Sequence, residues 1–282
     1  MLELTTIAGM RARREEAARQ GTRIALVPTM GALHQGHLSL LRKGLELADE
    51  VWASVFVNPA QFGPGEDFER YPRSLDHDRS LLAEAGCTVL FAPGVKEIYP
   101  REAVVTVDLP LLTHSLCGAH RPGHFAGVAL VVSKLLAIVR PQVAVFGAKD
   151  WQQSVVIRRL VEDLNLPVEI HVAPTCREAD GLAMSSRNAY LSPVQRLAAV
   201  VLVEALNEGT AALAAGERRS AELERLLAAR VAREPLATLQ YAAAVDPETL
   251  LPWDPVGPRV LLALAAYLGD TRLIDNRIVE VE

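Results

Sequence analysis

Residues 27–41 read V-P-T-M-G-A-L-H-Q-G-H-L-S-L-L, and this stretch is the strongest guide to the fold. Residues 23–27 read R-I-A-L-V, and this mostly apolar stretch predicts a buried strand that Pro28 closes. From about Gly36, apolar residues recur at helical spacing, which predicts an amphipathic helix over residues 36–49. A helix that directly follows a strand offers backbone N–H groups and the positive end of its dipole to an anion. The stretch therefore predicts a place to hold phosphate.

Two histidines lie at the mouth of this helix. His34 and His37 are three residues apart, so a helical turn places them on the same side. Each imidazole can donate a hydrogen bond to a phosphate oxygen. For either histidine alone, an ordinary polar loop residue is the alternative. The pair, with Gly36 between them and a strand before them, favours the phosphate site.

The composition argues against several classes of protein. Half of the 282 residues are hydrophobic, which is enough for one large domain or two smaller ones. The net charge of −5 argues against a nucleic-acid partner, and no uncharged apolar run reaches the length of a membrane span. Residues 1–20 lack the apolar core of a signal peptide, so we expect a cytoplasmic protein. Cys87, Cys117 and Cys176 are too widely spaced to indicate a zinc site or a disulfide framework.

Strands and helices alternate over the first part of the chain. Further strands are expected at residues 51–58, 88–91, 143–146 and 168–172, and further helices at 74–85, 124–139 and 150–164. The helix at 124–139 is almost wholly apolar and should be buried on most sides. This alternation predicts an α/β fold with a Rossmann-like, doubly wound parallel sheet, whose ligands lie at the carboxyl ends of the strands.

The pattern changes after about residue 174. Helices are expected at residues 193–215 and 218–234, and short apolar strands at 238–245, 259–267 and 271–275. Helices followed by short strands predict a small α+β domain. We therefore expect a first domain over residues 1–174 and a smaller C-terminal domain over residues 175–282.

Polar residues follow several of the predicted strands. Asn58 and Gln61 end the second strand, and their amides can hydrogen-bond a small hydroxy acid while its carboxylate stays nucleophilic. The neighbouring Gly and Pro residues are those that turns prefer, but a turn does not require a glutamine at position 61. Gly147 would give a nucleotide room beside the backbone, and Lys149 offers a mobile charge for a phosphate. Gln153 lies one turn further on and could face the substrate.

Two more segments carry basic residues. Met184-Ser185-Ser186-Arg187 places two hydroxyls and a guanidinium in a row, a compact anion clamp near the predicted domain junction. Arg121 and His124 precede the apolar helix and could cover an anionic ligand, with the loop at 113–123 as a lid. A simple helix entry is the alternative for His124.

The string P-T-M-G-A-L-H-x-G-H resembles the pantoate–β-alanine ligase family, the pantothenate synthetases, within the H-x-G-H nucleotidyltransferase superfamily. The resemblance spans about residues 23–195, with a looser echo at residues 272–276. Three positions depart from the family pattern, since Cys117 and Ala148 stand where Glu is usual and Trp151 stands where Tyr is usual.

The resemblance implies a ligase of pantothenate and coenzyme A biosynthesis that joins pantoate to β-alanine with ATP. The pantoate carboxylate would attack the α-phosphate and release pyrophosphate, and β-alanine would then attack the pantoyl adenylate and release AMP. It further implies a homodimer, and Mg²⁺ carried on the ATP phosphates with Asp78 or Asp150 as candidates to assist. The first domain would bind ATP and pantoate, and the second would close over the nucleotide.

The resemblance also assigns roles to individual residues. The residues with a catalytic role, holding the phosphates as charge builds, would be His34, His37, Lys149, Ser185, Ser186 and Arg187. Asn58, Gln61 and Gln153 would orient pantoate and β-alanine. The residues in contact with ATP would be Met30, Gly31, Ala32, Leu33, His34, Gln35, Gly36, His37, Gly147, Ala148, Lys149, Asp150, Cys176, Met184, Ser185, Ser186 and Arg187.

Two alternatives stay open at this point. A nucleotidyltransferase that moves AMP or CMP onto a phosphate-bearing acceptor would carry the same H-x-G-H motif. A nucleotide-binding regulatory protein without turnover is the second, supported only by Cys117 and Ala148. The amides of Asn58 and Gln61 favour the ligase over the first alternative.

Overall fold

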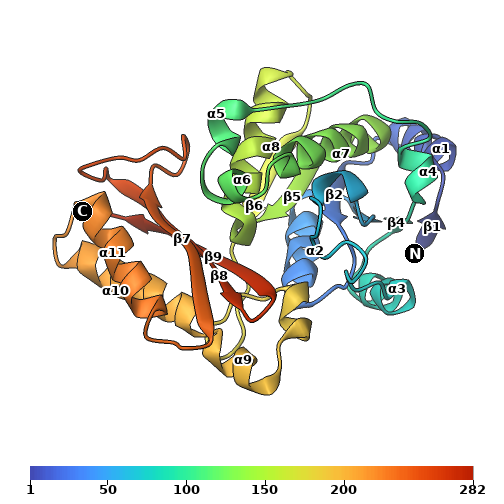
Figure 1. Cartoon of the computed structure of the whole chain (residues 1–282). Helices are drawn as coiled ribbons and strands as arrows, with labels where there is room; N and C mark the ends of the chain where they lie inside the picture. Colours follow the sequence, from blue (N-terminus) through green and yellow to red (C-terminus); the bar gives the residue numbers. More distant parts are fainter. Residues whose placement is uncertain (282) are drawn as a thin grey trace. The chain divides into compact units, whose positions relative to one another are not determined.

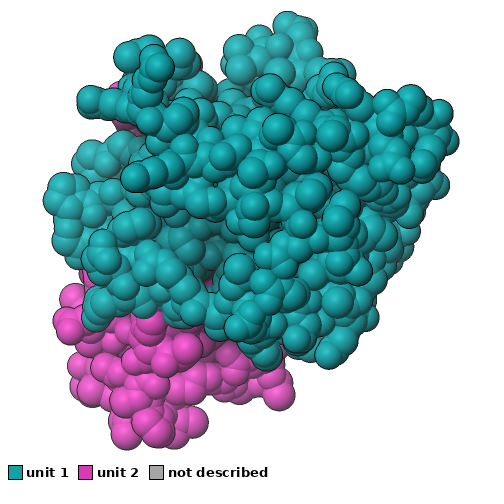
Figure 2. Space-filling model, turned by 90° about the vertical axis from the view of Figure 1, so that its right-hand side faces the viewer, with its two compact units in different colours: residues 1–109, 121–148, 153–174 teal, residues 110–120, 149–152, 175–282 magenta. Residues whose placement is uncertain are grey.

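The structure is a computed structural model that describes residues 1–281, and it contains two compact units (Figures 1 and 2). Unit 1 comprises residues 1–109, 121–148 and 153–174. Unit 2 comprises residues 110–120, residues 149–152 and the chain from Thr175 onward. Two short segments of the predicted first domain therefore belong to unit 2.

Unit 1 is built on a parallel sheet of six strands in the order β1-β4-β3-β2-β5-β6. The strands are β1 (Leu2–Leu4), β2 (Ile24–Thr29), β3 (Glu50–Val55), β4 (Val89–Phe91), β5 (Val143–Gly147) and β6 (Glu169–Ala173). The predicted Rossmann-like sheet is confirmed, and β1 is an edge strand that the sequence pattern did not predict. The order of strands along the chain reverses between β2 and β5, which makes that junction the topological switch point.

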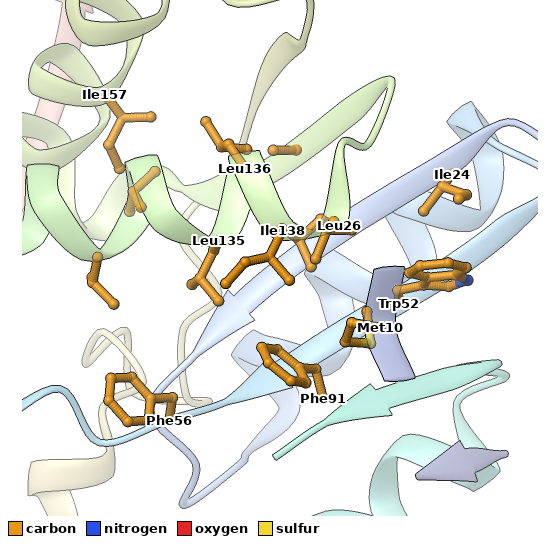
Figure 3. Packing of buried hydrophobic residues seen from close by; sticks show 14 of the residues in the cluster. Met10, Ile24, Leu26, Trp52, Phe56, Phe91, Leu135, Leu136, Ile138 and Ile157 are labelled. Carbon is orange, nitrogen blue, oxygen red and sulfur yellow. The ribbon is translucent and has the colours of Figure 1, made fainter. Parts of the chain in front are cut away.

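Helices cover both faces of this sheet. They are α1 (Ile7–Arg19), α2 (Gln35–Leu47), α3 (Leu75–Glu84), α4 (Val95–Ile98), α7 (His124–Val139) and α8 (Trp151–Asp163), with short 3₁₀ turns η1 (Pro59–Gln61) and η2 (Ala148–Asp150). One buried cluster joins Met10 of α1, Leu135 of α7 and Ile157 of α8 to the sheet (Figure 3). A second cluster packs Leu41 of α2 and Leu82 of α3 against the sheet.

The apolar helix α7 has the predicted bounds and burial. Ten of its residues are buried, and Leu135, Leu136 and Ile138 lie close to Leu26 of the central strand in Figure 3. Burial on most sides explains why its sequence has no polar stripe, because a helix in contact with the core all round needs no polar face.

Unit 2 contains an antiparallel sheet of three strands in the order β7-β8-β9. Its elements are α5 (Pro110–Thr113), α6 (Leu116–His120), η3 (Ser186–Tyr190), α9 (Pro193–Ala198), α10 (Val201–Ala214), α11 (Ser220–Val231), β7 (Ala237–Val245), β8 (Arg259–Leu268) and β9 (Thr271–Glu280). The predicted helix at 193–215 is two helices, and the strand predicted at 271–275 runs on to Glu280. The α+β character of this part is confirmed.

The stretch Pro193–Ala214 is long and apolar enough to cross a membrane by length and composition alone, with a mean hydropathy of 1.5. In the structure it forms α9 and α10, half of it is buried, and Leu202 and Leu206 lie in the core of unit 2. A core helix passes the same test, so the stretch is weak evidence for a membrane span.

Gly127 marks the place where α7 crosses η1. A Cβ atom at this position would lie 2.0 Å from the carbonyl oxygen of Ala60 and 2.8 Å from Cα of Gln61. Both neighbours are backbone atoms, which cannot move aside as a flexible side chain can. The bare glycine therefore sets how closely α7 approaches the segment that carries Gln61.

We expect Gly127→Ala to lower the free energy of unfolding by about 1–3 kcal/mol, the usual cost of overpacking. Urea denaturation followed by circular dichroism measures this change. Gly94→Ala is the matched control, since a Cβ there would meet no atom within 4 Å and its φ of −73° suits any residue. Equal stabilities for the two variants would contradict the packing argument.

Candidate active site at the carboxyl end of β2

The turn between β2 and α2 is shaped by side chains that accept its backbone N–H groups. Gly31 and Ala32 have left-handed φ angles of 85° and 51°. The amide of Gly31 donates to Oγ1 of Thr29 at 3.2 Å. The buried carboxylate of Asp78 accepts from the amides of Ala32 at 3.0 Å and Leu33 at 2.8 Å. Because Asp78 already binds these two amides, their contact with ATP stays a prediction.

His34 and His37 cap the start of α2 for each other. Nδ1 of His34 accepts from the amide of Gly36 at 3.1 Å, and Nδ1 of His37 accepts from the amide of His34 at 3.3 Å. A ring nitrogen that accepts carries no proton, so each neutral imidazole carries its proton on Nε2. The two ring centroids lie 4.2 Å apart, and an Nε2–H group on each ring is the form that donates to phosphate oxygens.

The side-chain amide of Asn58 is used entirely within the protein. Its nitrogen donates to Oε1 of Gln61 and to the carbonyl of Gly127, both at 3.1 Å. Its oxygen accepts from the amide of Ala60 at 3.3 Å and from the hydroxyl of Tyr99 at 2.9 Å. Asn58 is 1% exposed. This geometry favours a role in orienting Gln61, and a direct contact with pantoate stays a prediction.

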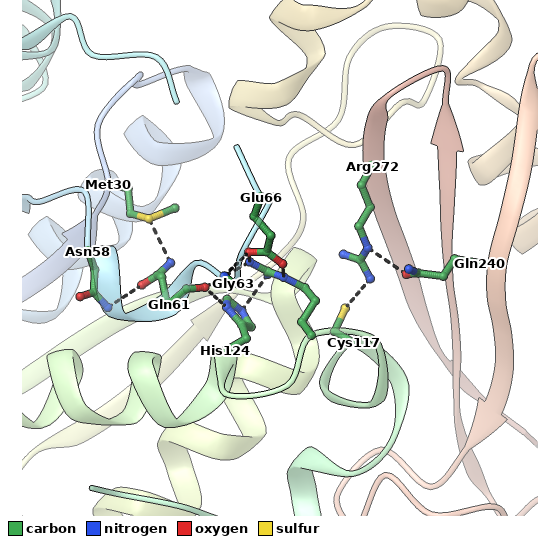
Figure 4. A network of polar contacts seen from close by, with 10 residues as sticks. Met30, Asn58, Gln61, Gly63, Glu66, Cys117, His124, Gln240 and Arg272 are labelled. Atoms are coloured by element: carbon green, nitrogen blue, oxygen red, sulfur yellow. Dashed lines mark hydrogen bonds and ion pairs between the residues drawn. The ribbon is translucent and has the colours of Figure 1, made fainter. Parts of the chain in front are cut away.

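Gln61 lies beside Met30 at the carboxyl ends of two neighbouring strands. The register pairs Thr29 of β2 with Val55 of β3, so the segments that follow both strands start side by side. Nε2 of Gln61 contacts Sδ of Met30 at 3.0 Å, and Figure 4 shows the two side chains facing each other. Sulfur is a weak acceptor, so the amide of Gln61 can exchange this contact for a stronger one with a ligand oxygen.

Arg121 and His124 fasten the backbone of Gln61 (Figure 4). Arg121 forms two hydrogen bonds of 2.6 Å with the carboxylate of Glu66, and its Nη1 lies 3.0 Å from Nε2 of His124. Nδ1 of His124 lies 2.8 Å from the carbonyl of Gln61. Since a carbonyl only accepts, His124 is protonated on Nδ1. Glu66 takes two donors of the Arg121 guanidinium, and the expected cover of Arg121 and His124 over an anionic ligand stays a prediction.

In unit 2, strand β9 holds the segment that carries Lys149. The side-chain nitrogen of Asn276 donates to the carbonyl of Lys149 at 2.7 Å. The neighbouring Asp275 is 2% exposed and binds Arg177 through both oxygens at 2.7 and 2.9 Å. Arg177 also donates to the carbonyl of Gly181 at 3.0 Å. A single network thus fixes the backbone of Lys149 and the turn that precedes Met184.

The serine and arginine residues predicted as an anion clamp form a compact turn. Ser185 accepts from the amide of Arg187 at 3.2 Å and caps η3, which also contains Ser186. The amide of Met184 donates to the carbonyl of Cys176 at 3.0 Å. Strand β9 also packs against η3, so the lysine and serine segments share one scaffold within unit 2.

The remaining predicted residues lie close to these groups in the chain. Gly147 ends β5 in unit 1, followed by Ala148. Gln153 is half-buried on α8 in unit 1, and Asp150 lies in unit 2 beside Lys149.

Of the expected lid at 113–123, residues 113–120 belong to unit 2 and include helix α6. Nε2 of Gln152 donates to the carbonyls of Leu112 and Ser115, both at 2.9 Å. Sγ of Cys117 lies 3.2 Å from the hydroxyl of Tyr241. It also lies 3.4 Å from Nη2 of Arg272, and Figure 4 shows this second contact. Burial, with Cys117 adding to it, raises the pKa of Tyr241 well above its usual value. Cys117 thus replaces the usual Glu inside a packed cluster.

Carboxylates near the predicted phosphate site are the candidates for binding Mg²⁺. Among residues 1–281, no group of three or more His, Cys, Asp or Glu side chains is placed to hold a metal ion. Asp78 is 1% exposed and each of its oxygens accepts a backbone amide, so its part in assisting Mg²⁺ stays a prediction. The carboxylate of Asp150 is half-exposed and lies 3.8 Å from Nζ of Lys149. A role of Asp150 in assisting Mg²⁺ stays a prediction.

A sequence model of the family described as pantoate-beta-alanine ligase matches residues 3–278. The chain belongs to the pantoate–β-alanine ligase family. The pantothenate synthetase of Moorella thermoacetica is 52% identical over 278 residues, which cover 99% of this chain and 98% of that protein. The resemblance found in the sequence is confirmed, and the protein is an enzyme of the ligase class in pantothenate biosynthesis. Family membership decides against the regulatory alternative.

Solved structures of family members have the same fold. The pantothenate synthetase of Thermus thermophilus matches with a TM-score of 0.92 and 47% identity, covering 98% of this chain and 99% of that one. The pantoate-beta-alanine ligase of Francisella tularensis, solved with beta-gamma ATP and β-alanine, matches with a TM-score of 0.81 and 35% identity. The latter match covers 99% of this chain and 97% of that one.

The Glu66–Arg121 pair predicts a pH dependence of stability. Burial alone would raise the pKa of Glu66, but the hydrogen bond and charge of Arg121 and the amide of Gly63 outweigh burial and lower it below the usual 4.5. The contribution of this pair to the free energy of unfolding is therefore fully present above pH 4.5. It is lost as the pH falls through the lowered pKa of Glu66.

Urea denaturation of the native chain and of Glu66→Gln, from about pH 3 to about pH 7, measures this contribution. The difference in unfolding free energy should be constant at the upper end and shrink at the acidic end. A difference that grows on acidification would contradict the assignment.

Proposed function

We propose that this enzyme condenses pantoate with β-alanine through a pantoyl-adenylate intermediate, with ATP as co-substrate. The observation that carries the proposal is the reciprocal cap of His34 and His37, which puts the proton of each ring on Nε2 at the carboxyl end of the central strand. Family membership and the switch-point position support the same reading.

In the first step, an oxygen of the pantoate carboxylate attacks the α-phosphorus of ATP, and the bond to the bridging oxygen of pyrophosphate breaks. No proton moves, so the protein needs no general base for this step. Negative charge builds on the phosphate oxygens, and the Nε2–H groups of His34 and His37 are the donors we assign to that charge. In the second step, the amine of β-alanine attacks the acyl carbon, AMP leaves and the amine gives up a proton.

Gln61 is the group we assign to pantoate. Among residues 1–281, its amide nitrogen donates only to the weak sulfur acceptor of Met30. Asn58 holds its oxygen, and Arg121 and His124 hold its backbone carbonyl. A fixed neutral amide orients the acid without attracting its charge away from the reacting carbon–oxygen group. Gln153 stays a second candidate for this role.

Lys149, Ser185, Ser186 and Arg187 are the groups that we assign to the phosphates from unit 2. We propose that the two units act as domains and that the second closes over the nucleotide. Mg²⁺ would arrive with the ATP phosphates and neutralise part of their charge, with Asp150 as the accessible carboxylate.

We also propose a cytoplasmic homodimer, as the family resemblance implies. One observation favours a second copy. Val104 and Val105 are 95% and 63% exposed in the β-branched stretch at 104–107, which no strand pairs among residues 1–281. Such a stretch is suited to pairing with another chain.

Pyrophosphate–ATP exchange tests the proposal directly, with D-pantoate present and β-alanine absent. Exchange that requires pantoate would establish the acyl-adenylate half-reaction, because only that step is reversed by pyrophosphate. No exchange, with ATP still bound, would reject the ligase reaction as written and favour transfer to a phosphate-bearing acceptor.

We expect His37→Ala to lower turnover by about 10²–10³-fold, or about 3–4 kcal/mol, the usual effect of one lost charge-stabilising donor. His37→Gln should retain more activity than His37→Asn, because the Gln amide nitrogen reaches the place of Nε2 and the Asn amide only that of Nδ1. His77→Ala, which removes an exposed imidazole of α3, is the control. A loss of less than threefold in His37→Ala would remove His37 from the mechanism.

Gln61→Ala should raise the KM for pantoate far more than the KM for ATP, because the amide is assigned to the acid alone. Steady-state kinetics with each substrate varied in turn separates the two effects. Equal increases in the KM for pantoate and the KM for ATP would contradict the assignment of Gln61 to pantoate.

A further inference from the structure

Asp78 reaches the histidine turn from another part of the chain. It lies 46 residues beyond Ala32, in the first turn of α3, and is 1% exposed. Its two oxygens divide their bonds, with Oδ2 accepting from Ala32 and Oδ1 from Leu33. The residue that follows Leu33 is His34, so these bonds end one peptide unit before the first imidazole.

The turn depends on this carboxylate for its shape. Ala32 has a φ of 51°, a left-handed conformation that costs free energy for a residue with a Cβ. Two charge-assisted hydrogen bonds from consecutive amides offset that cost. The first turn of α3 also favours a negative charge at this place through its dipole.

The turn is tightly packed on one side and borders a cavity on the other. A Cβ added to Gly31 would lie 2.9 Å from Oδ2 of Asp78 and 3.1 Å from Val55, so the turn sits tightly on the carboxylate. A cavity of about 260 Å³ adjoins the same place and is lined by Met30, Gly31, Val55 and Asp78, among others. A turn released from Asp78 therefore has room to move.

We propose that Asp78 is a positioning residue that holds the turn so that His34 and His37 aim their Nε2–H groups at the reacting phosphate. The proposal rests on the proposed function, and it replaces the sequence-based role of Asp78 in assisting Mg²⁺. Asp78 touches neither substrate nor metal in this role. It acts through two backbone amides.

Asp78→Asn is the decisive variant. The amide has nearly the same shape, but it offers one acceptor oxygen and turns an NH₂ group toward a backbone N–H. Loss of one bond should displace the imidazoles and lower kcat by about ten- to hundredfold, the range for small misplacements and lost supporting contacts. The KM values for ATP and pantoate should change by less than about threefold.

Asp76→Asn is the matched control, because this carboxylate lies two residues earlier on the same helix and its side chain is 97% exposed. It should retain the kcat of the native enzyme. The double variant Asp78→Asn, Ala32→Gly should recover several-fold in kcat, because glycine adopts the left-handed conformation without cost. A residue needed only for global stability would show no such rescue.

A spectroscopic readout separates this proposal from the proposed function. Nitrogen-15 spectra of labelled histidine report the ring tautomer, with His34 and His37 assigned by single substitution. The native chain should show both as Nε2–H, and Asp78→Asn should show a mixture of tautomers. Absence of pyrophosphate exchange in the native enzyme would sink the proposed function and leave this result intact.

Three results would overturn the proposal. The first is a kcat of Asp78→Asn within threefold of the native value. The second is unchanged histidine spectra in that variant. The third is failure of Asp78→Asn to fold even with Ala32→Gly, because Asp78 would then serve the whole unit and not the turn.

Discussion

The central position of β2 in the parallel sheet is the constraint on which the functional residues depend. This strand bonds β3 on one side and β5 on the other, and the chain order reverses between β2 and β5. Because every strand is parallel, the segments after all three leave from one edge of the sheet. The register between β2 and β3 then brings Met30 and Gln61 together, although 31 residues separate them.

Buried polar side chains fix the segments that leave this edge. Asp78 binds the turn before His34, Asn58 binds Gln61, and in unit 2 Asn276 binds the carbonyl of Lys149. Loops are usually the mobile parts of a protein. A buried donor or acceptor is costly to leave unpaired, so each of these contacts holds its partner in one arrangement. Catalysis by positioning and charge stabilisation requires such fixed geometry.

The backbone partners of three histidines decide the tautomer of each ring, and the two opposite tautomers both occur. His34 and His37 accept amide protons on Nδ1 and so carry Nε2–H. His124 faces the carbonyl of Gln61 with Nδ1 and so carries Nδ1–H. His34 and His37 are suited to donate to an anion. His124 instead bridges the guanidinium of Arg121 and the backbone carbonyl of Gln61. The local backbone, and not the residue type, decides which chemistry each imidazole can perform.

The sequence by itself determined the alternation of strands and helices, the apolar helix α7 and the paired histidines at a helix start. These are local properties, since the spacing of apolar residues within one segment decides which face is buried. It also carried the family resemblance, which the comparisons confirm. The change of pattern further indicated a change of architecture near residue 174.

The tertiary structure alone decided which distant groups meet. Strand β1 forms where Leu2 pairs with Val89 at the edge of the sheet, and Arg121 binds Glu66 across 55 residues of the chain. Asp78 binds Leu33 across 45 residues, and no local pattern marks a carboxylate as the partner of a remote amide. The physical reason is that periodicity encodes burial, which is local, whereas hydrogen-bond partners depend on where the folded chain returns.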